Sequence, residues 1–159
     1  MKMPVTCSVN GEAHTVLADT RDTLLDLLRE RIGLTGSKEG CGNGNCGTCT
    51  VLVDGVAVNA CLMLALEAPG RDIVTIEGLA PRGKLHPIQQ ALVEHGGTQC
   101  GFCTPGIVLS AKVFLDSNPN PSTQDVRHAI AGNICRCTGY DKIVDAIMAA
   151  AATLQAGGR

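Results

Sequence analysis

The first half of the chain alternates between apolar and polar positions in short runs. Residues 5–9 place valine and cysteine at every second position, a period of two that predicts a half-buried β-strand. Residues 10–11 are Asn-Gly, a strong signal for a hairpin turn, and residues 14–17 provide the return strand. A second hairpin is predicted over 50–58, around an Asp-Gly turn, and a further strand over 73–76.

One amphipathic segment interrupts these strands. Its leucines and Ile32 recur at helical spacing between Thr20, a residue type that caps helix starts, and Gly33, a residue type that ends helices. Two hairpins with a single helix between them predict a small mixed sheet that carries the helix across one face.

The second half has a helical pattern throughout. Apolar residues recur at spacings of three and four after four helix-start signals, which are Pro87, Thr104, Ser122 and Asp141. Four helices joined by short loops predict a bundle. From Gln155 onward the composition predicts a frayed tail.

These two patterns divide the chain into two domains. We predict an α+β protein with a strand-rich domain over 1–78, a helical domain over 84–154 and a linker over 77–84. A single hydrophobic core in domains of this size contributes only a few kcal/mol of stability. A metal centre in each domain would therefore supply a constraint that the cores lack.

Composition narrows the classes of function. The chain has 159 residues, a formal net charge of -2, two Phe, one Tyr and no Trp, which argues against a nucleic-acid-binding surface. No run approaches the roughly 18 apolar residues of a membrane span. The first residues lack the apolar stretch of a secretory signal, so we expect a cytoplasmic protein.

Cysteine is the exception in this composition, with nine residues. In a reducing compartment, clustered cysteines bind metal more often than they form disulfides. Cys41, Cys46 and Cys49 have the C-x4-C-x2-C spacing of plant-type 2Fe–2S ferredoxins, and Cys61 follows as the fourth ligand. Glycines between them let the backbone turn tightly around the sulfur atoms. Zinc is the alternative, although structural zinc sites favour two separate C-x2–4-C pairs.

A second group of cysteines lies in the helical half. Cys100 and Cys103 form a C-x2-C pair, and Cys135 and Cys137 form a C-x-C pair further along. Each pair stands just before a predicted helix, where free N–H groups and the helix dipole favour an anionic group. A C-x2-C pair alone also fits zinc or a redox-active dithiol, but the two pairs together predict a second four-thiolate site.

The ninth cysteine and the histidines have simpler interpretations. Cys7 falls on the inward face of the first predicted strand, which predicts a small buried apolar residue. No histidine is paired with a cysteine at the spacing of a Rieske site. One four-cysteine site per half, with no other chemical group in sight, indicates an electron carrier.

Three strings of the sequence resemble a known family. They are GCGNGNCGTC over 40–49, QCGFCTPG over 99–106 and GNICRCTGY over 132–140. Together they resemble the small iron–sulfur subunit of the xanthine oxidase family of molybdenum hydroxylases, from Val5 to about Ala152. The resemblance implies a ferredoxin-like β-grasp domain followed by a four-helix bundle domain.

The resemblance also implies a role for the chain. In that family a large molybdopterin-binding subunit oxidises the substrate, and electrons pass through the C-terminal cluster and then the N-terminal cluster, usually to FAD on a medium subunit. This chain would be the non-catalytic electron-transfer subunit, with the assembly expected to be a dimer of heterotrimers. A freestanding two-cluster electron carrier is the alternative, which the helical half argues against.

Site residues follow from the same resemblance. One 2Fe–2S cluster is assigned to four thiolates and the second to the other four, which are Cys41, Cys46, Cys49 and Cys61, and Cys100, Cys103, Cys135 and Cys137. The family also places a glutamine beside the pterin of the molybdenum cofactor, here Gln99, and the second cysteine of the C-x-C pair next to the pterin amine, here Cys137. The resemblance implies that the substrate pocket is on another chain, so this sequence does not identify the substrate.

Overall fold

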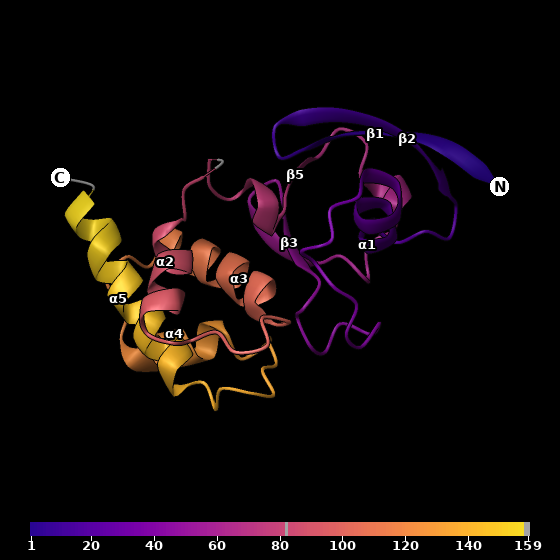
Figure 1. Cartoon of the computed structure of the whole chain (residues 1–159). Helices are drawn as coiled ribbons and strands as arrows, with labels where there is room; N and C mark the ends of the chain where they lie inside the picture. The colour runs from indigo at the N-terminus through magenta and orange to yellow at the C-terminus, as the bar shows by residue number, and fades with distance from the viewer. Residues whose placement is uncertain (82, 158–159) are drawn as a thin grey trace.

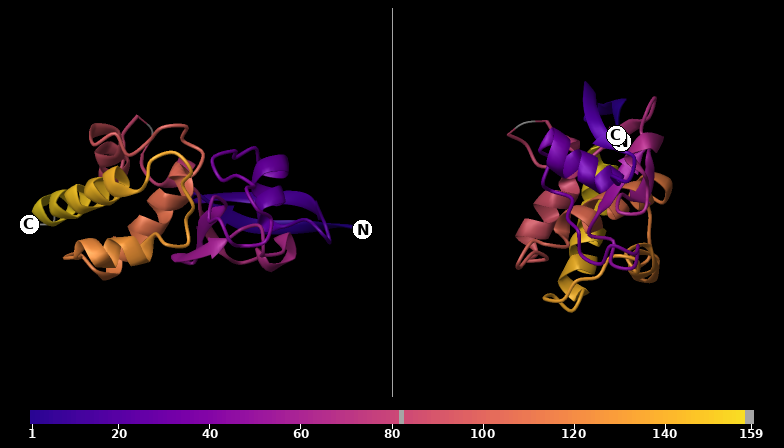
Figure 2. Two further views of the ribbon diagram at one scale, coloured as in Figure 1. Left: turned by 90° about the horizontal axis from the view of Figure 1, so that it is seen from below. Right: turned by 90° about the vertical axis from the view of Figure 1, so that its right-hand side faces the viewer.

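The computed structural model describes residues 1–81 and 83–157 and has a strand-rich half and a helical half. The two halves lie side by side, with the chain termini at opposite ends of the molecule (Figures 1 and 2). The predicted α+β class is therefore confirmed. Of the predicted linker, residue 82 lies outside the described residues, and a single 3-10 turn, η3 (Ile76–Gly78), occupies its start.

The strand-rich half is built on a five-stranded mixed sheet with the order β2-β1-β5-β3-β4. Its strands are β1 (Lys2–Val9), β2 (Glu12–Asp19), β3 (Thr50–Val53), β4 (Val56–Asn59) and β5 (Asp72–Val74). The two predicted hairpins, β1-β2 and β3-β4, are joined by β5, which pairs parallel to β1 and antiparallel to β3. This strand is shorter than the predicted 73–76, because η3 begins at Ile76.

The predicted helix is present but begins later than expected. A short α-helix, α1 (Leu24–Asp26), continues into a π-helical segment, η1 (Leu27–Ile32). Thr23 caps it, because its hydroxyl accepts the N–H of Asp26 while the Asp26 carboxylate accepts the N–H of Thr23. The predicted cap, Thr20, is wrong: its N–H is bonded to the first residue of the chain at the edge of the sheet.

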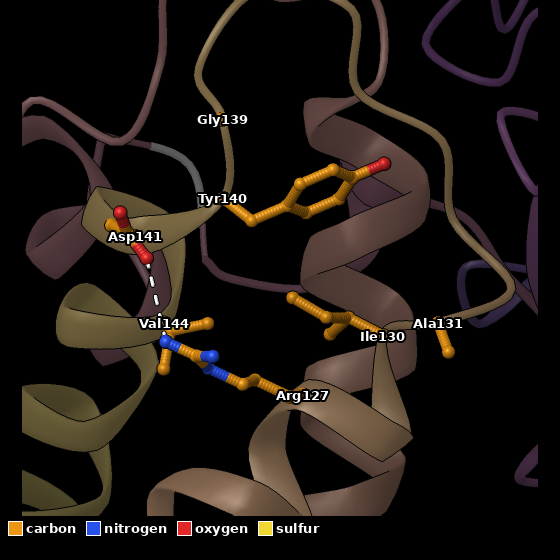
Figure 3. A pocket seen from close by; sticks show the side chains of 7 residues that line it. All are labelled: Arg127, Ile130, Ala131, Gly139, Tyr140, Asp141 and Val144. Carbon is orange, nitrogen blue, oxygen red and sulfur yellow. Dashed lines mark hydrogen bonds and ion pairs between the residues drawn. The ribbon is translucent and has the colours of Figure 1, made fainter.

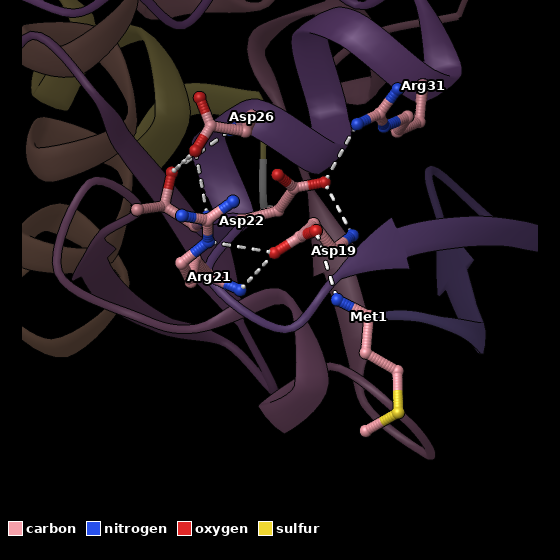
Figure 4. Close-up of polar contacts among 7 residues, drawn as sticks. Met1, Asp19, Arg21, Asp22, Asp26 and Arg31 are labelled. Atoms are coloured by element: carbon pink, nitrogen blue, oxygen red, sulfur yellow. Dashed lines mark hydrogen bonds and ion pairs between the residues drawn. The ribbon is translucent and has the colours of Figure 1, made fainter.

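A polar network connects this helix to the sheet (Figure 4). Asp19, at the end of β2, accepts the N-terminal amine of Met1 at 3.5 Å and the guanidinium of Arg21 at 3.1 Å. The backbone N–H and side chain of Arg21 lower the pKa of Asp19 to about 2. The Asp22 carboxylate accepts a hydrogen bond from the guanidinium of Arg31, in η1, at 3.0 Å. These contacts fix the turn between β2 and α1.

The helical half contains four α-helices that begin at the predicted signals. They are α2 (Pro87–Glu94), α3 (Thr104–Ser117), α4 (Thr123–Ala129) and α5 (Asp141–Gly157). The predicted frayed tail is wrong for 155–157, where α5 continues, and residues 158–159 lie outside the described part of the chain. The alanines of α5 favour the helical state, and the Gln155 amide donates to the carbonyl of Pro119.

Each half has its own hydrophobic core. Leucines of α1 and η1 pack against the inward face of the sheet, where Val5 and Ile73 are fully buried. Isoleucines and alanines of α5 pack against α2 and α4, and α3 completes the same core. In the part of the chain that the structure describes, no helix combines the length and apolar composition needed to cross a bilayer. The helix α3 also packs on β3 and β4, which joins the two halves.

Candidate iron–sulfur sites

The first predicted site is a glycine-rich loop between η1 and β3. Cys41, Cys46 and Cys49 lie on this loop, and Cys61 follows β4. The loop turns tightly because its glycines at 42, 44 and 47 adopt positive φ angles, as the sequence predicts. A side chain at Gly40 would place its Cβ 2.8 Å from the Sγ of Cys46, so the loop has no room for one there.

The four thiols of the first site are arranged as two pairs. The Sγ atoms of Cys49 and Cys61 lie 3.4 Å apart. Burial raises the pKa of Cys49 to about 11, and the Cys61 thiol contributes to the shift. The pKa of Cys41 is lowered to about 7, first by the N–H of Asn43 and then by the Cys46 thiol. Cys41 is thus surrounded by donors that stabilise a thiolate.

The second predicted site has the same paired arrangement. Cys103 stands immediately before α3, and its partner pair lies on the loop between α4 and α5. The Sγ atoms of Cys100 and Cys137 lie 3.5 Å apart. Burial raises the pKa of Cys103 to about 12, and the Cys135 thiol adds to the shift. The chain therefore brings together thiols separated by as many as 37 residues.

A 2Fe–2S cluster fits this arrangement. Within residues 1–81 and 83–157, no group of three or more His, Cys, Asp or Glu side chains surrounds one point as a single metal ion requires. The thiols stand instead in pairs, and a 2Fe–2S cluster takes four cysteine thiolates on two irons. The donor set is entirely sulfur, which is the ligand chemistry of such clusters. Both sites therefore offer one pair of thiols for each iron.

The two sites are in direct contact through the backbone. The N–H of Ile134, next to Cys135 of the second site, donates to the carbonyl of Cys46 of the first site at 2.8 Å. The amide of Asn133, which is 4% exposed, donates to the carbonyl of Gly47 at 3.0 Å. One hydrogen bond thus links Cys46 of the first thiol group to the residue that precedes Cys135 of the second.

The loop of the second site is held by residues that follow it. The hydroxyl of Tyr140 accepts the N–H of Cys135 at 2.8 Å and donates to the carbonyl of Asn133 at 3.4 Å. Tyr140 has a positive φ of 72°, a conformation that costs free energy for a bulky residue. Figure 3 shows its ring extending from the start of α5 across Ile130, at the rim of a pocket of about 330 Å³.

The remaining predicted residues are placed as follows. Gln99 and Cys137 are both exposed, and Cys137 is brought to Cys100, the residue after Gln99. Both side chains are therefore accessible at the surface of the helical half. Cys7 lies in the core of the strand-rich half at 4% exposure, and burial raises the pKa of its thiol. Cys7 shares this core with Cys49, but among the described residues the sulfur–sulfur contacts at each site join other cysteines, Cys49 with Cys61 and Cys100 with Cys137.

Sequence reasoning missed the residues that hold the second site in place and those that join it to the first. Asn133, Thr138 and Tyr140 belong to the string that carries the resemblance, but their partners are not evident from spacing. Gly106 was also missed: a Cβ there would lie 2.2 Å from the carbonyl oxygen of Gly47. The available signal was the glycine itself. Gly is a poor helix former, so a Gly directly after Pro105 in a predicted helix indicates a position where a side chain does not fit.

Comparison with known families supports two iron–sulfur domains. A 2Fe-2S iron-sulfur cluster binding domain matches residues 7–72. A second family, described as a 2Fe-2S binding domain, matches residues 75–148. The segment that matches the first family includes the loop with Cys41. The segment that matches the second family includes both cysteine pairs of the helical half.

Known proteins match over nearly the full chain. The small FeS subunit of nicotinate dehydrogenase from Eubacterium barkeri is 48% identical, over 92% of this chain and 93% of its own. A probable xanthine dehydrogenase subunit from Bacillus subtilis is 47% identical, over 86% and 79%. The crystal structure of quinoline 2-oxidoreductase from Pseudomonas putida 86 matches with a TM-score of 0.94 and 44% identity, covering 98% of both chains. The chain therefore belongs to the small 2Fe–2S subunits of the xanthine oxidase family of molybdenum hydroxylases.

Proposed function

We propose that this chain is the electron-transfer subunit of a molybdenum-containing oxidoreductase. The observation that carries the proposal is the pair of four-thiol sites, joined by the hydrogen bond from Ile134 to Cys46. When bound, 2Fe–2S clusters supply one-electron carriers to these sites. The chain contributes the thiolates, the N–H donors around them and the contact that keeps the sites adjacent.

We propose the ligands of each cluster on the support of the thiol pairs. The first cluster is held by the loop cysteines with Cys61, and the second by the cysteines before α3 with those of the 135–137 segment. In full these are Cys41, Cys46, Cys49 and Cys61, and Cys100, Cys103, Cys135 and Cys137. We assign no catalytic residue to the chain, because the substrate is oxidised on a partner subunit.

The exposed ends of the two sites suggest where partners bind. Gln99 and Cys137 lie exposed beside the second site, which supports contact with the pterin of a large molybdopterin-binding subunit. Cys41 lies exposed at the first site, which supports electron delivery to FAD on a medium subunit or to another acceptor. The proposed assembly is a cytoplasmic dimer of heterotrimers.

The domain organisation is part of the same proposal. The strand-rich half would be a ferredoxin-like β-grasp domain over 1–78, supported by the mixed five-stranded sheet crossed by α1 and η1. The helical half would be a four-helix bundle domain over 84–154, supported by the shared core of α2 to α5. Each domain then holds one cluster.

Removing one cluster tests the proposed order of electron flow. In the purified complex, Cys49→Ala should remove the first cluster and abolish reduction of the acceptor. Substrate, identified by screening nicotinate, xanthine and an aldehyde, should still reduce the second cluster, as followed by its EPR signal. Cys7→Ala, which leaves both ligand sets intact, is the control.

Two results would contradict the proposal. If Cys49→Ala left the second cluster unreduced by substrate while the molybdenum site remained active, the order of the sites would be reversed. If the purified chain carried both clusters but never associated with a molybdopterin-binding subunit on co-expression, it would be a freestanding carrier.

A further inference from the structure

Each candidate cluster site has one threonine hydroxyl next to a cysteine sulfur. At the first site, Thr48 Oγ1 lies 3.2 Å from the Sγ of Cys46. At the second, Thr138 Oγ1 donates to the Sγ of Cys135 at 3.1 Å. Thr48 is buried and Thr138 is half-buried, so surrounding water competes little for either contact.

The two hydroxyls differ in what else they contact. Thr138 Oγ1 accepts the backbone N–H of Tyr140 at 3.2 Å. Because a hydroxyl has a single proton and this contact uses one of its lone pairs, the proton of Thr138 is left for Cys135. Thr48 Oγ1 has a second acceptor, the carbonyl oxygen of Lys38, also at 3.2 Å. Its proton is therefore divided between a carbonyl and a sulfur.

The backbone around Thr138 keeps its hydroxyl in this position. Gly139 and Tyr140 both have positive φ angles, 67° and 72°, which turn the N–H of Tyr140 back toward Thr138. The Tyr140 hydroxyl holds the N–H of Cys135 at 2.8 Å. The same tyrosine thus holds both the backbone of Cys135 and the Thr138 hydroxyl that donates to the Cys135 sulfur.

We propose that Thr138 is a positioning residue that raises the reduction potential of the second cluster through its hydrogen bond to Cys135. This inference rests on the proposed function, in that Cys135 binds a cluster. Reduction adds one electron and one negative charge to the site, and no bond is formed or broken. A donor to a ligand sulfur stabilises the more negative state more strongly, so it raises the potential. Thr48 acts in the same way on the first cluster, but more weakly.

A higher potential at the second site has a direct use. This site is the one proposed to receive electrons from the molybdenum centre, and a better electron acceptor there draws electrons out of the substrate-oxidising subunit. For a one-electron couple, a tenfold change in the reduction equilibrium corresponds to 59 mV. A single hydroxyl donor is expected to shift the equilibrium by about threefold to tenfold.

The test compares variants of the complete complex that keep or remove the hydroxyl. Thr138→Val removes it at nearly constant volume, and Thr138→Ser retains it. Thr153→Val removes an exposed hydroxyl of α5 that donates only to the carbonyl of Ala149, and is the matched control. Iron and sulfide are measured first. The midpoint potential of each cluster is then determined by redox titration followed by EPR.

The expected result is that Thr138→Val lowers the potential of one EPR signal, shifting its reduction equilibrium threefold to tenfold toward the oxidised state. Thr138→Ser and Thr153→Val should leave it unchanged. Thr48→Val should lower the potential of the other signal by a smaller amount. Complete loading with iron shows that the site binds a cluster, so the proposed function is judged separately from the shift.

Several outcomes would overturn the proposal. Equal potentials in Thr138→Val and Thr138→Ser would show that the hydroxyl has no effect. Equal shifts of both clusters in Thr138→Val would show that the effect does not act through the hydrogen bond to Cys135. If Thr138→Val does not retain iron, Thr138→Ala provides the same comparison with a smaller side chain. Loss of the cluster in both, with retention in Thr138→Ser, would assign the hydroxyl a structural role and reject tuning.

Discussion

At the scale of single residues, the surroundings of a cysteine indicate its role better than its residue type. Cys7 and Cys49 are both buried, at 4% and 2% exposure, and burial raises the pKa of both thiols. Only Cys49 has another thiol within 3.4 Å, that of Cys61. Cys7 is paired across the hairpin with His14 and packs in the core of the sheet. Its role is therefore that of a small apolar side chain.

Substituting Cys7 tests this distinction. Cys7→Ser should retain both clusters but lose about 1–3 kcal/mol of stability, because a hydroxyl replaces a buried thiol without gaining a partner. Cys7→Val, which stays apolar, should lose less. Iron analysis and thermal unfolding of the purified holoprotein provide the two measurements. Loss of half the iron in both variants would show that Cys7, and not Cys61, is a ligand.

Contacts between residues that are distant along the chain could not be predicted from the sequence. The eight cysteines predicted as ligands could be picked out from their short spacings and from the family resemblance, because C-x4-C-x2-C, C-x2-C and C-x-C are local patterns. The partners of Asn133 could not, since Gly47 lies 86 residues away. A buried side-chain amide that donates a hydrogen bond to the other half of the molecule produces no periodic pattern in the sequence. The same holds for the hydroxyl of Tyr140, whose partners depend on the positive φ of that residue.

At the scale of elements, the sequence predicts where most helices begin better than it predicts how long they are. Helix starts depend on a few neighbouring residues, so the capping box of Ser122 and Asp125 is evident in the sequence and is present at α4. The displaced start of α1 has the same chemistry at Thr23, but several threonines precede that helix and only packing decides among them. The length of α5 depends on its docking near Pro119.

The contact between α3 and the first cluster loop leads to a prediction about elements. A Cβ at Gly106 would lie 2.2 Å from the carbonyl oxygen of Gly47, an atom that cannot move without moving the loop. Gly106→Ala gains about 1 kcal/mol in helix propensity. Overpacking a tight contact costs about 1–3 kcal/mol, and the clash involves backbone on one side. We expect net destabilisation and reduced iron content at the first site.

Gly132→Ala is the matched control for this substitution. A Cβ at Gly132 meets nothing within 4 Å, and its φ is not in the positive range. The two variants are compared by thermal unfolding and by the EPR signals of both clusters. Equal unfolding temperatures for Gly106→Ala and Gly132→Ala would show that the close approach of α3 to the loop has no energetic consequence.

At the scale of the whole molecule, each half supplies one four-thiol site, and the two sites meet where the halves meet. The first-site loop rests on α3 and on the 132–135 segment of the helical half. Each core is small, so a cluster in each half would contribute directly to folding. The sequence patterns indicate a strand-rich half and a helical half with a group of cysteines in each, but the contact between the two groups depends on tertiary packing and is evident only in the structure.

The paired arrangement of thiols makes a prediction about the metal content of the complete chain. A 2Fe–2S cluster takes four cysteine thiolates, so the eight paired cysteines should bind about four irons and about four acid-labile sulfides. Cys61→Ala and Cys103→Ala should each retain about two irons, because each removes one ligand of a different cluster. The holoprotein should be red-brown, whereas zinc thiolates are colourless. Metal analysis of the three proteins, with absorption spectra, provides the measurement. Zinc in place of iron, or loss of all iron in either variant, would contradict two separately held 2Fe–2S clusters.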